Sequence, residues 1–282
     1  MSLDVSIIIV HTFERQLVRQ TLRSLRRSAP KVSYEVIVVD NNPAAGMGQT
    51  LATEFHDVVY VPLTKNVGFG SAMNRGMEKA QGRYILIFNP DIIVRSGSLE
   101  ELVRFMDISS DVGVCGPQLL NPDGTLQHSC YRLPSLFLPA YRRTPLGKWS
   151  HGREAVEDYL MMHDAHDETM DVDSLIGAAL FCRAEVLKEI GMFDEQFFMY
   201  YEDNDLCRRF WQAGHRVVYH PGSVMVHYHR RASADGGLFS QLLSKFAWIQ
   251  IASFIKYYRK YFRQSNPRIN ANGVANANTF AK

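Results

Sequence analysis

The segment Asn66–Val94 reads NVGFGSAMNRGMEKAQGRYILIFNPDIIV, and the fold can be read outward from it. Its glycine-rich start leads into a helical spacing of apolar residues over Phe69–Ala80. The uninterrupted apolar run Tyr84–Phe88 follows and is typical of a strand that is buried on both faces. This strand ends in Asn89-Pro90-Asp91, so we expect polar side chains at the carboxyl end of a central strand.

The same alternation of strand and helix fills the chain up to about residue 110. Apolar runs predict strands over Val5–Val10, Tyr34–Val39 and Val58–Pro62, and helical spacing predicts helices over Glu14–Ser28, Thr50–Phe55 and Ser98–Met106. This alternation indicates an α/β fold with a mainly parallel central sheet flanked by helices. Ligands bind such sheets at the carboxyl ends of the strands, where Asp40, Asn41 and Asn42 are expected beside Asn89 and Asp91.

After residue 110 the pattern changes. Asn121-Pro122-Asp123-Gly124 is a strong turn signal, which we expect between two strands. Residues 134–171 mix proline, glycine, histidine and charge with little periodicity, which predicts a long mobile excursion. Regular structure is expected at Val112–Gly116, Leu175–Cys182 and Val217–Tyr219 (strands) and at Ala184–Ile190, Asn204–Ala213 and Leu238–Phe262 (helices).

The composition excludes several classes of protein. With 46% hydrophobic residues among 282, the chain can form a sizeable core, and a net charge of +2 argues against a dedicated nucleic-acid binder. The four cysteines form no CxxC pair, so we expect no zinc site and reduced thiols in the cytoplasm. The N-terminal apolar run is too short for a signal peptide, and no stretch is long and apolar enough to predict a membrane span.

The segment Phe193–Asp205 reads FDEQFFMYYEDND and places five carboxylates among five aromatic residues. Aromatic surroundings can hold a carboxylate partly dry and raise its pKa, which suits a general base. Two sites would account for the acidic residues at Asp91 and in this segment. A divalent cation near Asp91 would hold a diphosphate, and a carboxylate of this segment would accept a proton.

Two nucleotide-binding classes lack their expected motifs. The first predicted strand runs into His11-Thr12-Phe13, where a dinucleotide-binding protein would have GxGxxG. The same tripeptide replaces the basic glycine-rich loop that a nucleotidyltransferase would need after its first strand. The sequence therefore favours neither a dehydrogenase nor an enzyme that makes sugar nucleotides.

Five segments, in this order and spacing, carry a resemblance to a known family. They are SIIIV (6–10), VIVVDNN (36–42), the segment 66–94, NPDGTLQ (121–127), and the stretch 175–229 that starts LIGAALF and ends VMVHYH. Over roughly residues 4–262 the chain resembles the inverting family-2 glycosyltransferases with the GT-A fold. It is most similar to the rhamnosyltransferase-like members that build bacterial cell-surface polysaccharides.

The resemblance implies a Mg²⁺ or Mn²⁺ ion that bridges the diphosphate of a nucleotide-sugar donor. Asp91 stands where the family has a metal ligand, and Asn89 replaces the first acid of the family's Asp-x-Asp motif. An amide oxygen brings no charge, so Asn89 would either coordinate weakly or contact the ribose. His227 is the implied second ligand, with His229 as its rival on the same strand face.

The resemblance also implies the catalytic base and the donor contacts. Asp203 would deprotonate the acceptor hydroxyl, with Glu202 and Asp205 orienting the acceptor or steadying the base. One displacement would invert the anomeric carbon without a covalent intermediate. The family places pyrimidine recognition at Asp40 and wraps the base and diphosphate with Asn66, Asn74 and Arg75, and Gly177 would leave room under the donor sugar.

These expectations give a domain plan. Residues 1–237 would form the GT-A catalytic domain, with 1–110 as the nucleotide-binding half and 111–237 as the acceptor-binding half. Residues 238–263 would form a helical segment, for which three placements are open. It either packs on the catalytic domain, contacts a second copy of the chain, or lies on the anionic inner face of the cytoplasmic membrane. Residues 264–282 would be a disordered tail.

Three functional hypotheses remain. The first is transfer of rhamnose from dTDP-rhamnose to a cell-surface polysaccharide or a lipid-linked acceptor. The second keeps the fold and chemistry but uses a UDP-sugar donor. The third is a non-catalytic protein that binds nucleotide sugars, against which Asp203 argues because a binder needs no base.

Overall fold

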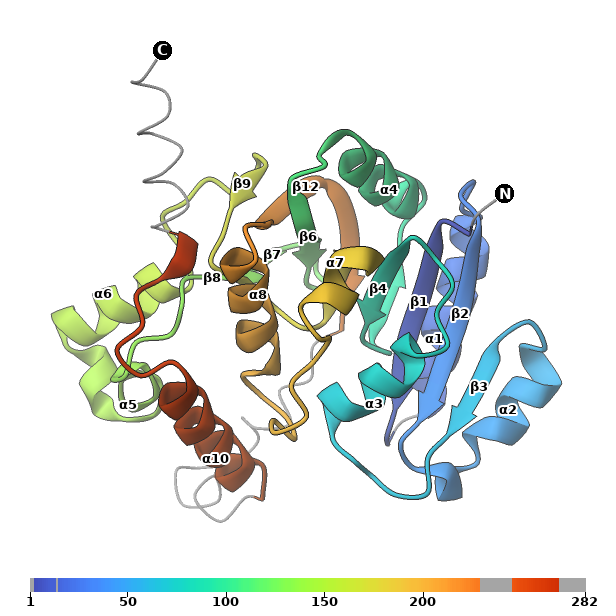
Figure 1. The fold of residues 1–282 in the computed structure, drawn as a ribbon, viewed down its shortest axis with the longest axis horizontal. Helices are drawn as coiled ribbons and strands as arrows, with labels where there is room; N and C mark the ends of the chain where they lie inside the picture. Colours follow the sequence, from blue (N-terminus) through green and yellow to red (C-terminus); the bar gives the residue numbers. More distant parts are fainter. Residues whose placement is uncertain (1–2, 14, 229–244, 269–282) are drawn as a thin grey trace.

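The computed structural model describes residues 3–13, 15–228 and 245–268, and its centre is a mixed β-sheet. In spatial order the main strands are β3 (Val59–Pro62), β2 (Tyr34–Asp40), β1 (Val5–His11), β4 (Tyr84–Phe88), β11 (Ala179–Arg183), β6 (Val112–Leu120), β12 (Arg216–His227) and β5 (Ile92–Val94). Two short strands, β7 (Leu126–Gln127) and β9 (Met170–Asp171), pair with β6 and β12, and β8 (Cys130–Tyr131) pairs with β10 (Ser174–Leu175). Figure 1 shows β1 to β3 at one side of the molecule and β6 and β12 near its middle.

The first half of the sheet is parallel, as the sequence predicts. Strands β3, β2, β1 and β4 run the same way, with Val5 level with both Tyr34 and Tyr84. All seven residues of β1 are buried, which is what a β-branched apolar run achieves when helices cover both sheet faces. Because these strands are in register, His11 and Asp40 end side by side at the carboxyl edge.

The second half of the sheet mixes directions. Strand β11 is antiparallel to both β4 and β6, while β12 runs parallel to β6 and antiparallel to β5. The predicted turn at Asn121–Gly124 is confirmed, because β6 and β7 flank it as an antiparallel pair. The antiparallel β12–β5 pairing carries the end of β12 to the strand that follows Asp91.

Helices cover both faces of the sheet. The helices α1 (Arg15–Ser28), α2 (Met47–Glu54) and α4 (Ser98–Ile108) pack with Ile7 and Ile9 on one face. The helices α3 (Phe69–Met77), α7 (Ala184–Glu189) and α8 (Glu202–Gln212) pack with Ile8 on the other face. Successive side chains of a strand point to opposite faces, so β1 alone contributes to both cores.

The segment expected to be an irregular excursion has regular structure, so that expectation was wrong for its conformation. Residues 134–171 contain α5 (Leu138–Arg143), the 3₁₀ turn η2 (Pro145–Lys148), α6 (Ser150–Tyr159) and β9. Pro139 and Pro145 lie in the first turns of α5 and η2, where proline fits because the lost N–H needs no partner. These elements are too short for a clear helical period to show in the sequence.

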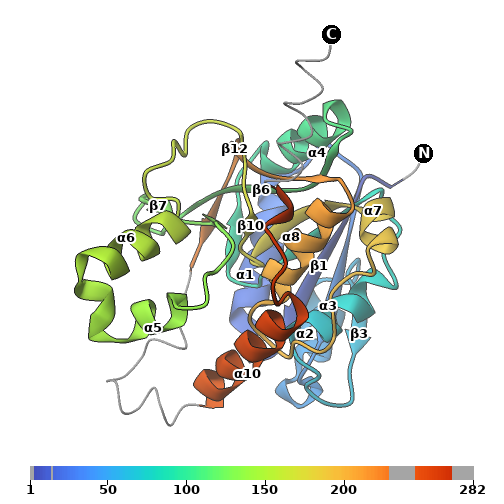
Figure 2. The ribbon, with the colours of Figure 1, turned by 60° about the vertical axis from the view of Figure 1, so that its left-hand side comes forward.

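Helix α10 (Lys245–Lys260) packs on the domain that contains the sheet, one of the three placements that the sequence left open. Tyr257 and Tyr261 form a small core with Phe197, and Ser253 donates a hydrogen bond to the Met199 carbonyl. Figure 2 shows α10 on the same side of the molecule as α5 and α6. The expected disordered tail was wrong for residues 264–268, because Asn266 and Arg268 both bind the buried Asp173 carboxylate. The expectations for residues 238–244 and for the tail beyond 268 fall outside the described residues.

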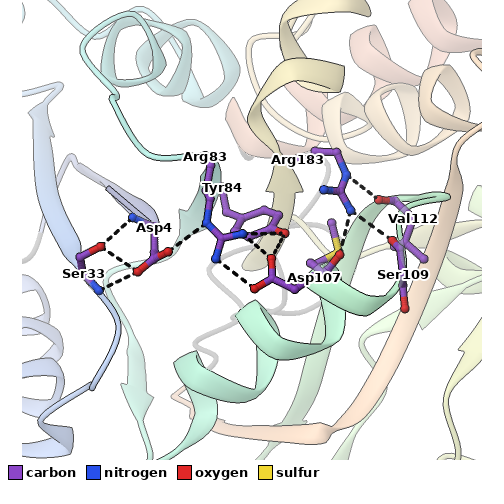
Figure 3. Close-up of polar contacts among 9 residues, drawn as sticks. Asp4, Ser33, Arg83, Tyr84, Asp107, Ser109, Val112 and Arg183 are labelled. Atoms are coloured by element: carbon purple, nitrogen blue, oxygen red, sulfur yellow. Dashed lines mark hydrogen bonds and ion pairs between the residues drawn. The ribbon is translucent and has the colours of Figure 1, made fainter. Parts of the chain in front are cut away.

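A polar network ties the opposite, amino-terminal edge of the parallel strands (Figure 3). Arg83 pairs with both Asp4 and Asp107, and Tyr84 also donates to Asp107 at 2.7 Å. Arg183 donates to the carbonyls of Ser109 and Met106 at the end of α4, which satisfies groups that a helix leaves unpaired. This edge is therefore committed to holding the fold, and the opposite edge remains for a ligand.

Candidate active site

A pocket of about 580 Å³ lies at the carboxyl edge of the parallel strands. Its walls come from the turns that follow β1, β2 and β3, with Phe13, Asn42 and Asn66 among the lining residues. Asn66 accepts hydrogen bonds from the Asn41 side chain and from the Gly68 backbone, both at 2.9 Å. The predicted donor residue Asn66 therefore lies on this pocket and also shapes the glycine-rich turn.

Asp40 is fully buried below this pocket, in contact with two other side chains. One carboxylate oxygen lies 2.8 Å from His11 Nδ1, and the other accepts from the Tyr60 hydroxyl at 2.8 Å. Burial, and then the hydrogen bond to Asp40, raise the pKa of Tyr60 to about 12. Asp40 is thus held in a fixed orientation, and its neighbours Asn41 and Asn42 line the pocket.

Asp91 and His227 meet although they are far apart in sequence. His227 pairs with Ile92 in the β12–β5 ladder, and this register places His227 Nε2 3.2 Å from Asp91 Oδ1. The other ring nitrogen, Nδ1, lies 2.6 Å from the Gln127 amide oxygen. That oxygen can only accept, so we assign the proton to Nδ1 and leave Nε2 directed at the carboxylate.

This geometry fits a divalent cation. The Asp91 carboxylate oxygen and the His227 ring nitrogen are ligand types that divalent cations accept in proteins, and they lie close enough together to bind one ion. Among the described residues no group of three or more His, Cys, Asp or Glu side chains could hold a metal, so at this place the protein would supply two ligands. Mg²⁺ commonly takes one or two protein ligands and completes its shell with phosphate oxygens and water. The rival ligand His229 lies outside the described part of the chain.

Asp203 lies in the first turn of α8 and faces a second pocket of about 1240 Å³. The Gly177 backbone donates to its Oδ2 at 3.1 Å, and the Asn204 backbone and side chain donate to Oδ1 at 2.8 and 2.9 Å. Burial raises the pKa of the Asp203 carboxyl above its usual value, and these hydrogen bonds oppose part of that rise. The carboxylate is therefore oriented and made more basic at the same time.

Glu202 lines the same pocket but is more deeply buried. Burial, and then the charge of Asp203, raise the pKa of Glu202 well above its usual range. Its Oε2 has no hydrogen-bond partner among the described residues. Tyr200 and Tyr201, which precede this helix, both have left-handed backbone conformations. Such conformations cost free energy in residues other than glycine and are found most often at functional sites. Glu202 and Asp203, which follow them, both line the pocket.

The second pocket is related to the Asp91–His227 pair through Gln127, because neither Asp91 nor His227 lines it. Gln127, which contacts His227, and Asp203 both line it. The backbone N–H of Asn89 donates to the Ala178 carbonyl at 2.8 Å, next to Gly177, which in turn contacts Asp203. A Cβ added at Gly177 would lie 3.4 Å from Asp203 Cβ, which shows how closely this backbone approaches the Asp203 side chain.

Several lining residues could not be assigned to the site from the sequence. The outer wall comes from α5, α6 and α10, including Tyr141, Tyr159 and Phe254. Gln127 carried only one signal, its place at the end of the segment NPDGTLQ.

Two predicted donor residues lie elsewhere. The Asn74 side chain donates to the Phe193 carbonyl at 2.9 Å and accepts from the Phe193 N–H at 3.0 Å, so it pins the acidic segment to α3. Arg75 pairs with Glu78 at 2.7 Å and Glu195 at 3.5 Å on the exposed side of α3. Neither side chain lines either of the two pockets.

Asp205 also has a structural place. It is fully buried, and its carboxylate contacts Arg209 Nε, the Tyr261 hydroxyl and Lys260 Nζ at 2.8, 2.8 and 2.6 Å. Asp205 therefore anchors the end of the C-terminal helix to α8, and it does not line the pocket that contains Asp203.

The fold and the site define a class of protein. A mixed α/β sheet, with a pocket and an Asp–His pair at its carboxyl edge and an acidic helix start facing them, is the GT-A fold of glycosyltransferases. The chain belongs to Glycosyl transferase family 2, whose family model matches residues 6–152. The resemblance seen in the sequence is thereby confirmed.

Relatives and solved structures agree with this assignment. The chain is 28% identical over 214 residues to the N-acetylglucosaminyl-diphospho-decaprenol L-rhamnosyltransferase of Mycobacterium tuberculosis, covering 68% of this chain and 66%, or about two thirds, of that relative. It is 27% identical over 239 residues to rhamnosyltransferase WbbL of Escherichia coli, covering 79% and 83% of the two chains.

Two solved structures support the fold alone. The crystal structure of GalNAc-T7 with UDP, GalNAc and Mn²⁺ superposes with a TM-score of 0.66 at 15% identity, over 93% of this chain and 49% of that one. Residues 1–349 of S. aureus TarS in complex with UDP superpose with a TM-score of 0.53 at 16% identity, over 79% and 60%.

Proposed function

We propose that this chain transfers a sugar, with inversion, from a nucleoside-diphosphate sugar to a hydroxyl of a glycan or lipid-linked saccharide. The observation that carries this proposal is the shared pocket. It is lined by Asp203, a carboxylate with a raised pKa, and by Gln127, which orients the imidazole of the Asp91–His227 pair. Asp203 lines this cavity directly, and the Asp91–His227 pair is related to it through Gln127, whose side chain contacts the imidazole.

In this proposal Asp91 and His227 hold a Mg²⁺ or Mn²⁺ ion, which when bound offsets the charge of the departing diphosphate. Gln127 keeps the His227 ring oriented, as second-sphere partners of metal-binding histidines do. Asn89 follows the end of β4, two residues before Asp91, and its backbone N–H donates to the Ala178 carbonyl. Its amide is available to the metal or to the ribose.

Asp203 acts as the base in a single displacement. The acceptor oxygen forms its bond to the anomeric carbon as the bond from that carbon to the diphosphate oxygen breaks, and the hydroxyl proton passes to Asp203. No protein nucleophile is required, so the configuration inverts once. Gly177 and Asn204 hold the carboxylate in place during the step.

The donor assigned here is dTDP-rhamnose, with a UDP-sugar as the alternative. Two relatives named as rhamnosyltransferases support the first, and two solved structures that contain UDP favour the second. Asp40 would select uracil or thymine by accepting the ring N–H. It already has partners on both oxygens, and a carboxylate has room for about four hydrogen bonds.

The acceptor assigned here is a saccharide on a lipid diphosphate, made at the cytoplasmic side of the membrane. The name of the mycobacterial relative includes such an acceptor, which supports this choice. The four cysteines are all free and buried, which is consistent with a reducing compartment.

A donor panel tests the proposal. Wild-type protein is incubated with dTDP-rhamnose or UDP-sugars, a lipid-diphosphate saccharide, and Mn²⁺ or EDTA, while nucleoside diphosphate release is measured. We expect metal-dependent release with dTDP-rhamnose that disappears in Asp203→Asn. Binding of donors without turnover for any acceptor would instead favour a non-catalytic nucleotide-sugar-binding protein.

A further inference from the structure

Helix α10 is apolar on two opposite faces. One face packs on the domain through Ala247, Ser253 and Tyr257. On the other face Trp248 and Ile255 are 64% and 50% exposed, and Ile251 lies between them in a stripe with spacings of three and four residues. Exposed apolar side chains that gather in one stripe of a helix commonly mark a contact surface, so we expect the stripe on α10 to meet another apolar phase.

A second group of exposed apolar side chains lies on the neighbouring segment. Phe137 and Trp149 are 63% and 69% exposed, and Leu136 and Leu146 are also exposed. This segment lies beside α10, because the Tyr258 hydroxyl donates to the Pro134 carbonyl, and Figure 2 brings α5, α6 and α10 forward on one side of the molecule. We call residues 136–149 together with the solvent face of α10 the rim surface.

The rim surface surrounds the mouth of the pocket that contains the base. Leu138 and Arg142 of the first segment and Ile251 and Phe254 of α10 all line that pocket, as does Asp203. A partner that covered the rim surface would therefore lie directly at the acceptor's entrance.

The charge of these segments indicates which partner fits. Residues 134–153 contain four Arg or Lys and residues 245–263 contain five, and neither segment contains Asp or Glu. The rest of the chain has all 29 acidic residues against 22 basic ones. Exposed Arg142, Lys148, Lys256 and Arg259 thus interleave with the exposed aromatic and aliphatic side chains.

We propose that the rim surface binds an anionic lipid bilayer, with Trp248, Ile255, Phe137 and Trp149 entering the interface and the basic side chains meeting lipid headgroups. Aromatic, aliphatic and basic residues on one face are the composition of an interfacial helix. None of the helices in the described ranges is long and apolar enough to cross a membrane, so α10 lies on the surface. A symmetric contact between two copies would set these basic side chains against each other, which disfavours a dimer through this face.

Delivery of a lipid-linked acceptor to Asp203 by this surface rests on the proposed function. Binding of the surface to lipid does not depend on that function. The proposal explains why the acceptor pocket opens among apolar and basic groups. A saccharide on a membrane anchor would then meet the base without leaving the headgroup layer.

Vesicle co-sedimentation of the full chain tests the proposal. The probes are vesicles of phosphatidylcholine alone and of phosphatidylcholine with phosphatidylglycerol. We expect binding only to the anionic vesicles, weakened by salt, and reduced about tenfold or more in the double variant Trp248→Glu/Ile255→Glu. Ile108→Glu is the matched control, because Ile108 is 70% exposed on α4, outside the rim surface, and its variant should bind as wild type does.

Two further readouts separate the alternatives. Circular dichroism checks that each variant is folded, and Arg259→Glu supplies a second test that removes charge and leaves the apolar stripe intact. Release of nucleoside diphosphate with a water-soluble acceptor should be unchanged in the double variant, so a failure of catalysis and a failure of lipid binding are distinguishable. Equal vesicle binding by wild type and the double variant, no binding by either, or a lipid-free dimer that the double variant dissociates would overturn the proposal.

Discussion

The backbone N–H of Gly177 donates a hydrogen bond to Asp203 Oδ2 at 3.1 Å. The next residue, Ala178, leads into β11, and its carbonyl accepts a hydrogen bond from the backbone N–H of Asn89, which follows β4. The central sheet therefore fixes the distance between the candidate base and the end of the strand that leads to Asp91.

The pH dependence of turnover should reflect Asp203. Because burial raises the pKa of its carboxyl, Asp203 takes up its proton at a higher pH than an ordinary aspartate, and the rate should fall as the pH decreases through that value. We expect kcat/KM measured from pH 4 to 8 to decrease on the acid side with a midpoint above 3.8, the ordinary value for aspartate. A rate that stayed constant down to pH 4 would contradict the assignment.

Glu202 should make the fold less stable as the pH rises. Its pKa in the folded state is raised, so between the unfolded value of 4.5 and the folded value the folded state binds more protons, and stability is lost with increasing pH. Glu202→Gln removes this titration. We expect the variant to have a higher Tm than wild type at pH 7 and a smaller difference at pH 5, measured by calorimetry. A lower Tm of Glu202→Gln than of wild type at pH 7 would contradict this, because it would mean that other groups stabilise the ionised Glu202 carboxylate in the folded state.

The Asp91–His227 pair should determine metal-dependent binding of the nucleotide. We expect Asp91→Ala to weaken binding of a nucleoside diphosphate in Mn²⁺ by 100-fold or more, and Gln127→Ala to weaken it by about 10-fold, because Gln127 only orients the imidazole. Titration calorimetry with Mn²⁺ or EDTA measures both effects. If wild type bound the nucleotide as tightly in EDTA as in Mn²⁺, the proposed role of Asp91 and His227 as metal ligands would be contradicted.

Asn74 and Arg75 are neighbours with opposite expected effects. Asn74→Ala leaves the N–H and carbonyl of Phe193 without their partners and should lower the free energy of unfolding by about 2 kcal/mol or more. Arg75→Ala breaks exposed ion pairs and should change it by less than about 1 kcal/mol. Urea unfolding measures both values. A rise in the KM for the donor in Arg75→Ala, at unchanged stability, would restore the donor role that the resemblance implies.

The first half of the fold follows from local pattern. Strands such as Val5–His11 are short apolar runs whose burial on both faces fixes their type, and polar residues at their ends mark the ligand edge. The strands after residue 110 are less local. Strand β12 runs from Arg216 to His227 through Pro221 and Gly222, which interrupt its apolar pattern, so only Val217–Tyr219 was predicted from it.

The site was predictable where a motif carried it and not where packing made it. Asp91 and His227 were singled out by resemblance, but their approach to 3.2 Å depends on the antiparallel β12–β5 register, which nothing in either segment encodes alone. The wall formed by α5 and α6 was missed because helices of six and ten residues show little period. The contact of Asn74 with Phe193 could not be predicted either, because a buried amide that pairs with backbone resembles a ligand-binding amide in sequence.

The most direct test of the central claim is a single-turnover experiment on Asp203→Asn. Donor affinity is measured on the same protein, and Asn204→Ala is the control because Asn204 contacts the carboxylate without being the base. The account predicts that Asp203→Asn lowers the transfer rate at least 100-fold while donor affinity stays within about threefold of wild type, and that Asn204→Ala has a smaller effect on the rate. A transfer rate within tenfold of wild type in Asp203→Asn, or an equal loss of donor affinity and rate, would contradict it.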